Sequence, residues 1–255
     1  MRVDIWSDVV CPWCYIGKRR FDKGLAAFEH AGDVEVVYHS FELDPEIEPG
    51  QAGRVLEMLA AKYRMSPAQA AQAEDRVAVA AAADGLGYTA DRAIGNTFDA
   101  HRLMHLAGDL GRAEQLLQRL YQAYFAEGRS VFDAESLAAL AGDAGIDPGE
   151  ARRALDDGSY ADAVRADEDQ AREVGISSVP FFVIDWKYGF SGARPAELLT
   201  EALREAWNAG PTSGVAISTR TAPNRAAWRA AVAFGAMCRS AAWLTDNRCT
   251  DGSVR

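Results

Sequence analysis

The sequence predicts an α/β domain that is interrupted by a long helical insertion. Two observations support this fold class: β-rich apolar segments occur only near the two ends of residues 1–209, and the segments between them have helical apolar spacing. The order β-α-β, helical block, β-β-α requires the two halves of the α/β domain to meet in space. The predicted boundaries are 1–48 and 175–209 for the two halves of the core, 49–174 for the inserted helical domain, and 210–255 for a basic C-terminal extension.

The first half of the core begins with the β-rich apolar run Arg2–Val10, which predicts a strand. Cys14–Ala31 carries apolar side chains at helical spacing, and Gly32 stands at the position of a C-cap. Val34–Phe41 predicts a second strand after a short turn. The segment Cys11–Cys14, with the sequence CPWC, therefore lies where the first strand meets its helix.

The insertion is predicted to be helical because Ala, Leu, Glu and Arg predominate from about residue 51 to 174, with no convincing strand. Apolar residues recur three and four positions apart, and glycines separate the segments. The predicted helices cover 52–64, 67–85, 97–110, 112–127, 133–144, 148–156 and 160–174.

The second half of the core returns to strand character at Val179–Ile184. Asp185–Trp186 predicts a hairpin turn that leads into a short strand, Tyr188–Ser191. The last helix of the core is predicted over Pro195–Trp207, with Pro195 at the first helical position.

The charge balance and the hydropathy pattern count against two classes of protein. A net charge of −10 does not favour a nucleic-acid binder, and no segment approaches the roughly 18 apolar residues of a membrane-spanning helix. We therefore expect neither nucleic acid nor membrane as a partner. Residues 1–209 carry −14, whereas 210–255 carries +4 from six Arg and two Asp. Within that extension, 224–244 is compatible with an Ala-rich helix or with a poorly ordered chain.

The N-terminal residues predict a cytoplasmic protein. A signal peptide has an uninterrupted apolar run, and Asp4 and Asp8 interrupt the apolar residues here; an export route without a leader stays open. Four cysteines are too few for a disulfide scaffold. In a reducing compartment, a close pair of cysteines is more often catalytic or metal-binding than structural.

The pair Cys11 and Cys14 is the strongest candidate for chemistry. Structural zinc needs a second close pair of ligands, and Cys238 and Cys249 are separated by ten residues, so we expect no metal. A thiolate at a helix N-terminus is stabilised by unpaired backbone N–H groups and by the positive end of the helix dipole. This position favours redox chemistry.

The placement of the two sulfurs predicts their roles. We expect Cys11 to be the exposed thiol that acts as nucleophile, and Cys14, one turn inside the helix, to be the resolving thiol. Pro12 removes a donor from the first turn without cost to the helix, and Trp13 supplies bulk beside the sulfurs.

The second signal is the dipeptide Val179-Pro180, which opens an apolar strand although proline cannot donate to a sheet ladder. A trans proline that only starts the strand is one interpretation. A cis proline that faces the CPWC and leaves the backbone of Val179 free for a bound peptide is the other. The strand–CPWC–helix unit favours the cis interpretation.

These segments together resemble the DsbA-like branch of the thioredoxin superfamily. Within that branch, three motifs resemble the FrnE-type cytoplasmic proteins: SDVVCPWCYIGKRRF at 7–21, NTFDAHRL at 96–103 and VPFFVIDWKYGFSGARP at 179–195. The resemblance covers about residues 1–207. It implies a thioredoxin-like fold with an inserted helical domain (DsbA-like) and thiol–disulfide oxidoreductase activity.

The resemblance also implies residue roles and partners. Cys11 and Cys14 would form the redox pair, and Pro180 would be the cis proline. The expected partners are protein or low-molecular-weight thiol and disulfide substrates and a recycling reductant or oxidant. No cofactor is expected beyond the redox-active pair, and glutathione stays open as a co-substrate. Cys238 and Cys249 do not reproduce the close second pair that some members carry in a C-terminal extension.

Two other functions stay open. The same superfamily contains glutathione-dependent 2-hydroxychromene-2-carboxylate isomerases and kappa-class glutathione transferases, which typically have serine where Cys11 stands. Isomerisation needs one activated group and dithiol exchange needs two sulfurs, so retention of Cys14 beside Cys11 favours redox work. The third hypothesis is a chaperone-like binding module that uses a groove of the helical domain.

Two ionisable residues have competing interpretations. His101 lies in a segment that the resemblance places over the CPWC, where an imidazolium could stabilise the Cys11 thiolate or move its proton. Packing at the domain interface explains His101 equally well. Asp4 could accept the proton of the resolving thiol, but a partly exposed carboxylate at a strand end is favoured.

The remaining candidates are predicted to be structural or to form the rim of the site. Trp13, Phe181 and Phe182 are expected to form an apolar lip, with at least one of the two phenylalanines in the core instead. The charged run Lys18–Arg20 is expected to face solvent. Three polar residues of the insertion have no predicted part in the chemistry: Asn96, Arg102 and His105.

Overall fold

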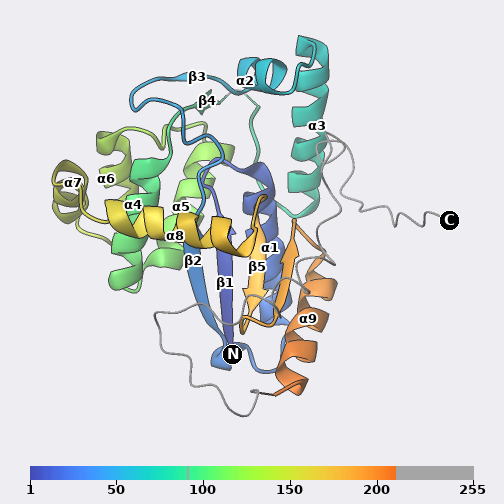
Figure 1. Cartoon of the computed structure of the whole chain (residues 1–255). Coiled ribbons are helices and arrows are strands. Elements are labelled where there is room, and N and C mark those ends of the chain that lie inside the picture. Colours follow the sequence, from blue (N-terminus) through green and yellow to red (C-terminus); the bar gives the residue numbers. More distant parts are fainter. Residues whose placement is uncertain (91, 211–255) are drawn as a thin grey trace.

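A computed structural model describes residues 1–90 and 92–210 of the chain (Figure 1). Its architecture is an α/β core with a helical insertion between the two halves of the core, as the sequence predicts. Cys238, Cys249 and the segment 224–244, on which the sequence gives predictions, lie outside the described residues.

A four-stranded sheet forms the centre of the core, in the order β2-β1-β5-β6. The strands are β1 (Arg2–Ser7), β2 (Glu35–Ser40), β5 (Phe181–Ile184) and β6 (Tyr188–Ser191). Strand β1 is parallel to β2 and antiparallel to β5, with Trp6 opposite Phe181, and β5 is antiparallel to β6. The predicted meeting of the two halves of the chain is therefore the β1–β5 pairing. The predicted turn at Asp185–Trp186 is also present, and both residues have positive φ.

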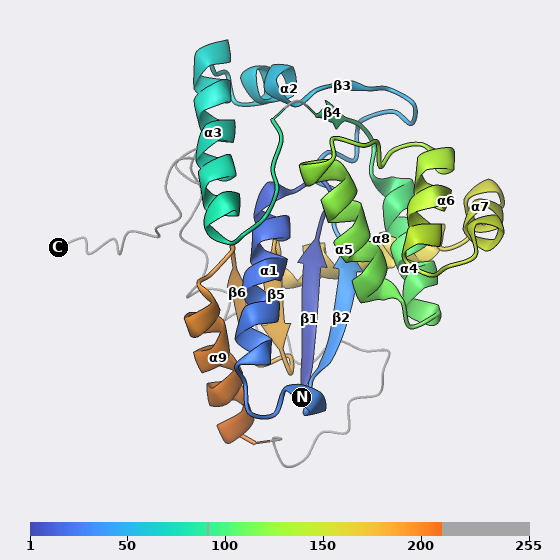
Figure 2. The ribbon, with the colours of Figure 1, turned by 180° about the vertical axis from the view of Figure 1, so that it is seen from behind.

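Helices α1 (Pro12–Ala26) and α9 (Ala196–Asn208) pack against each other beside the sheet (Figure 2). A Cβ atom at Gly24 would lie 2.8 Å from the carbonyl oxygen of Ala196, so glycine permits the close approach. Helix α1 ends at Ala26 rather than at the predicted Ala31, and Gly32 belongs to a 3-10 turn instead of a C-cap.

The insertion contains the predicted helices, with bounds shifted by a few residues. They are α2 (Val55–Lys62), α3 (Pro67–Ala83), α4 (Phe98–Asp109), α5 (Ala113–Tyr121), α6 (Ala134–Asp143), α7 (Pro148–Asp156) and α8 (Ala161–Val174). The predicted helix 112–127 continues beyond α5 as the π-helical turn η2 (Gln122–Ala126). Within the described chain, no helix combines the length and the apolarity needed to cross a membrane.

The structure differs from the sequence prediction in a short strand pair and in the start of α9. A two-stranded ladder, β3 (Gly53–Arg54) with β4 (Ala93–Ile94), lies in the insertion, where no strand is predicted. Strands of two residues are too short to produce an alternating pattern. Pro195 is the N-cap residue of α9 rather than its first helical residue.

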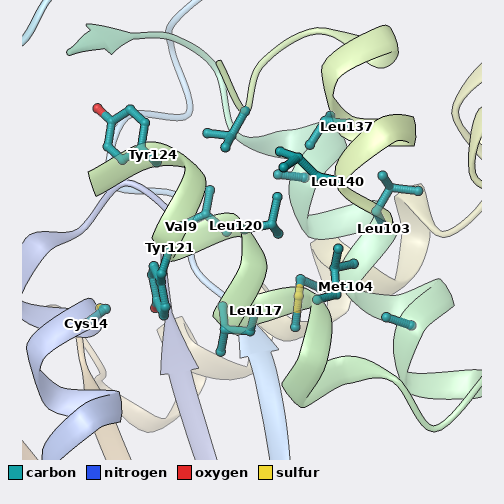
Figure 3. Packing of buried hydrophobic residues seen from close by; sticks show 14 of the residues in the cluster. Val9, Cys14, Leu103, Met104, Leu117, Leu120, Tyr121, Tyr124, Leu137 and Leu140 are labelled. Carbon is teal, nitrogen blue, oxygen red and sulfur yellow. The ribbon is translucent and has the colours of Figure 1, made fainter. Parts of the chain in front are cut away.

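The insertion surrounds the core in two groups of elements. Helices α2 and α3 and the β3–β4 ladder lie above the N-terminal end of α1, and α4 to α8 lie beside β2 (Figures 1 and 2). One hydrophobic cluster joins the second group to the CPWC segment and includes Cys14, Leu117, Leu120 and Tyr121 (Figure 3). The ring of Tyr15 stacks on that of Phe125 at a centroid distance of 5.0 Å. The CPWC segment is therefore packed against the insertion.

A buried polar network fastens β2 to β1 and to α8. Nδ1 of His39 lies 2.7 Å from Oδ1 of Asp167, and Nε2 lies 2.8 Å from Oδ1 of Asp4. Burial alone lowers the pKa of His39, but hydrogen bonds to Asp167 and Asp4 raise it to about 9. The favoured expectation of a partly exposed Asp4 is wrong, because the side chain is fully buried and also accepts from Arg2.

The expectation of a solvated face at Lys18–Arg20 is wrong for two of the three residues. Lys18 is buried, and its Nζ lies 2.7 Å from a carboxylate oxygen of Asp22. Nε of Arg20 lies 2.7 Å from Asp84, at the end of α3. Both side chains are therefore paired with carboxylates instead of facing solvent alone.

We predict that Gly24→Ala lowers the free energy of unfolding by about 1–3 kcal/mol. The new Cβ would meet the carbonyl oxygen of Ala196 and lie 3.1 Å from Cβ of Leu199, which outweighs the helical preference of alanine. Urea unfolding followed by circular dichroism measures the change. Gly32→Ala is the matched control, because nothing lies within 4 Å of its Cβ position. Equal stability of the two variants would contradict the tight α1–α9 contact.

We predict that His39→Gln destabilises the protein more at pH 6 than at pH 9.5. The folded pKa exceeds the ordinary value of 6.5, so the stabilisation is fully present below pH 6.5 and is lost as the pH rises through 9. The difference in unfolding free energy between wild type and variant should shrink by about 2–3 kcal/mol over that range. His30→Gln, at an exposed site, is the control. A difference that stays constant with pH would show that His39 is not held as a cation.

Candidate active site

Cys11 is the N-cap residue of α1, and its sulfur stands at the N-terminal end of that helix. Its carbonyl oxygen accepts the N–H groups of Cys14 and Tyr15 at 3.0 and 3.2 Å, while its own N–H donates to the carbonyl of Asp8. Pro12 occupies the first helical position, so the helix begins directly after the cysteine. The thiol therefore lies at the positive end of the helix dipole, where a thiolate is stabilised.

The loop before β5 faces this sulfur. The Val179–Pro180 peptide bond is cis, which confirms the predicted cis proline. Sγ of Cys11 lies 3.7 Å from the carbonyl oxygen of Val179. A Cβ atom at Gly17 would lie 2.9 Å from Cγ of Pro180, so a glycine in α1 lets the helix approach the proline loop. The CPWC and the Val-Pro motif, about 168 positions apart in the chain, form one site.

Cys11 lies at the floor of a cavity rather than on the surface. The residue is 2% exposed, so the expectation of an exposed thiol is wrong. The cavity above it has a volume of about 240 Å³. Its walls come from α2, α3 and β4, from residues 43 and 44, and from residues 177 to 179.

The three residues expected to form an apolar lip take different positions. Trp13 lines the cavity, but Phe181 and Phe182 are both buried in the core. Phe182 stacks on Phe190 and contacts Phe21 on the face of the sheet that α1 covers. The prediction of an apolar lip is therefore wrong for both phenylalanines. Residues of the insertion line the cavity beside Trp13 instead.

Cys14 lies one turn inside α1 and is fully enclosed. It sits beside Tyr121 at the edge of the hydrophobic cluster (Figure 3). Burial raises the pKa of the Cys14 thiol well above its ordinary value, and the hydrogen bond and charge of Cys11 raise it further. The protonated form of Cys14 is therefore favoured while Cys11 is a free thiolate.

Asp8 connects the cysteine segment to His101. Its carboxylate is fully buried, accepts the N–H of Leu43 at 2.8 Å and lies 3.4 Å from Nε2 of His101. Burial lowers the pKa of His101, but the nearby Asp8 carboxylate raises it above the ordinary value. His101 is not among the described residues that line the cavity over Cys11. Its Nε2 faces Asp8, three positions before Cys11 in the chain.

Two further carboxylates near His101 were not singled out by the sequence. Burial, together with the neighbouring carboxylate of Glu168, raises the pKa of Glu42 to about 7. Nη1 of Arg165 lies 3.0 Å from Glu42 and 2.9 Å from Glu168. Both carboxylates raise the pKa of His101. A series of ionisable groups therefore leads from Asp8 towards the half-exposed Arg165.

The three polar residues of the insertion with no predicted chemistry are held by structural contacts. Arg102 donates to the carbonyl groups of Leu155 and Ser159. Asn96 donates to the carbonyl of Ile47. Nε2 of His105 lies 3.1 Å from Asp167 and joins the network of His39. In the described ranges, no group of three or more His, Cys, Asp or Glu side chains is arranged to hold a metal ion.

Comparison with known proteins identifies the fold. The chain matches the family described as DSBA-like thioredoxin domain over residues 2–204. A solved probable DsbA oxidoreductase from Streptomyces coelicolor is 53% identical, with a TM-score of 0.80 over 86% of this chain and 94% of that chain. Among curated proteins, the uncharacterized Bacillus subtilis (strain 168) protein YwbO is 27% identical over 185 residues, which is 72% of this chain and 86% of that protein.

Two more distant structures share the fold alone. A 2-hydroxychromene-2-carboxylate isomerase is 16% identical, with a TM-score of 0.62 over 82% of this chain and 97% of that chain. The cytosolic disulfide reductase DsbM from Pseudomonas aeruginosa is 15% identical, with a TM-score of 0.56 over 82% of this chain and 100% of that chain. The thioredoxin-like fold with an inserted helical domain is therefore confirmed.

We predict that Asp8→Asn lowers the pKa of His101, because burial is then no longer opposed by the nearest carboxylate. Histidine-ring NMR titration measures this value, with His101→Gln to assign the signal. Asp99→Asn, on the same helix and half-exposed, is the control and should leave the titration unchanged. An unaltered pKa of His101 in Asp8→Asn would show that the two side chains do not form an ion pair.

Proposed function

The chain belongs to the DSBA-like thioredoxin domain family, and from that membership we propose that it is a thiol–disulfide oxidoreductase acting through Cys11 and Cys14. The observation that carries the proposal is the position of the Cys11 sulfur. It lies at the N-terminus of α1, 3.7 Å from the Val179 carbonyl and at the floor of a cavity that a substrate can enter. Proteins or small molecules that carry a disulfide, glutathione disulfide among them, are the candidate substrates.

The proposed reaction has two exchange steps. The Cys11 thiolate attacks one sulfur of a substrate disulfide, so that a Cys11–substrate disulfide forms and the other substrate sulfur leaves as a thiolate. The Cys14 thiolate then attacks the Cys11 sulfur and releases the second substrate sulfur. Two electrons pass from the dithiol to the substrate, and the pair is left as a Cys11–Cys14 disulfide. The reverse sequence oxidises a substrate dithiol, and a separate reductant or oxidant restores the pair.

The surroundings of Cys14 support this order of events. The charge and hydrogen bond of Cys11 are among the causes that raise the pKa of Cys14, and both are removed when Cys11 is bonded to a substrate. The first step therefore makes the deprotonation of Cys14 easier, although burial continues to oppose it. Cys14 is thus protonated while Cys11 attacks. It loses its proton more easily once Cys11 is bonded to the substrate.

We predict that Cys11→Ser reduces insulin-disulfide reduction, driven by dithiothreitol, to the rate without protein, because serine does not exchange disulfides. The matched control replaces both cysteines of the extension, Cys238→Ser with Cys249→Ser, and should retain the wild-type rate. Wild-type activity in Cys11→Ser would contradict the proposal. Turnover of an aromatic substrate that requires glutathione and Cys11 but survives Cys14→Ser would instead identify a glutathione-dependent isomerase or transferase.

A further inference from the structure

We infer that the disulfides exchanged at Cys11 carry an apolar group beside the reacting sulfur, and that this group enters the cavity beneath α2 and α3. The inference rests on the proposed function and names the class of substrate for the same site. Three properties of the cavity support it: the apolar lining, the pairing of the charged side chains, and the volume.

The lining is mainly apolar around the sulfur. Side chains from four separate segments face the same space, and the apolar ones among them include Val10, Trp13, Val55, Met58, Leu59, Val77 and Ile94. Leu43 and Tyr63 also line the cavity and are 37% and 41% exposed, so the apolar surface continues to the outside. An apolar group that moves from water into this space is stabilised in proportion to the area it buries.

The charged side chains of the lining are already paired. There are four of them, and they form two ion pairs, Lys62 with Asp44 and Arg92 with Glu74. The lining therefore has no net charge. A charged substrate group would have to break one of these pairs or remain unpaired in an apolar space, and both are costly.

The guanidinium group of Arg92 is already occupied by neighbouring side chains. Its Nη2 donates to Glu74 at 2.9 Å and to the hydroxyl of Tyr88 at 3.0 Å. The guanidinium group also lies over the rings of Tyr88 and Phe125, at 4.5 and 5.0 Å from their centroids. Its Nε has no hydrogen-bond partner among the described residues, but this atom is enclosed and not accessible to a molecule in the cavity. Arg92 thus does not offer a site for a substrate carboxylate.

The size of the cavity limits the group that enters. Its volume of about 240 Å³ is smaller than the roughly 300–1,000 Å³ typical of sites for drug-sized ligands. Because Cys11 is only 2% exposed at its floor, a disulfide must project from a small molecule or from an unfolded segment. The space accommodates a Leu- or Phe-sized group beside that disulfide.

The test compares three peptide disulfides with the reduced full-length protein. The peptides are dimers of blocked tripeptides with Leu, Ser or Glu on both sides of the cysteine, and chromatography measures the released peptide thiol. Each rate constant is divided by the rate constant of the same disulfide with dithiothreitol, which corrects for intrinsic reactivity. We expect the corrected rate for the Leu peptide to exceed the other two by about 10-fold.

A matched pair of variants locates the preference in the cavity. Met58→Glu places a carboxylate in the lining and should remove most of the 10-fold preference for the Leu peptide over the Ser peptide. Val79→Glu makes a similar apolar-to-acid change on α3 at a residue that is 71% exposed, and should leave all three rates unchanged.

The outcomes separate the inference from the proposed function. Equal corrected rates for the three peptides, or an equal loss in both variants, would overturn the inference and leave the oxidoreductase proposal standing. Failure of the wild-type protein to reduce any of the three disulfides would instead contradict the proposed function. If Met58→Glu does not fold, the comparison of the three peptides on the wild type decides alone.

Discussion

The site depends on the contact between the start of α1 and the cis-proline loop. Because β1 and β5 are antiparallel neighbours, with Trp6 opposite Phe181, the end of one strand lies beside the beginning of the other. The chain after β1 therefore begins α1 with Cys11 directly beside the carbonyl of Val179. Gly17 permits the approach that this arrangement requires. The helix N-terminus, the sulfur and the Val179 carbonyl are thus brought together by the pairing of two strands.

The insertion supplies what the core alone lacks. Helices α2 and α3 and strand β4 line the cavity over the Cys11 sulfur. The cluster formed by α4 to α8 buries Cys14. The parallel pairing of β1 and β2 brings their carboxyl ends to one edge of the sheet, where Asp8 and Glu42 follow the two strands. His101, from the insertion, lies beside Asp8 at this edge. One side of the site therefore carries the cavity, and the other holds buried ionisable groups.

Local sequence patterns predict the helices, the CPWC at the start of α1 and the cis proline, because spacing and neighbouring residues determine these features. The burial of Cys11 is not predictable in this way, since it depends on how the segments carrying Leu43 and Ile94 pack over a distant helix. The burial of Lys18 likewise depends on distant packing and on Glu114, 96 positions later. Asp8 and Glu42 could have been found, because a polar residue after each of two parallel strands marks a shared edge.

In the proposed mechanism, Cys11, although buried, is the sulfur that attacks a substrate disulfide. This step is tested by mass-spectrometric mapping of the Cys14→Ser variant after reaction with a peptide disulfide, because the first intermediate cannot then be resolved within the site. We expect a single peptide bound through a disulfide to Cys11. Attachment at Cys238 or Cys249 instead, or no attached peptide in a folded variant, would contradict it.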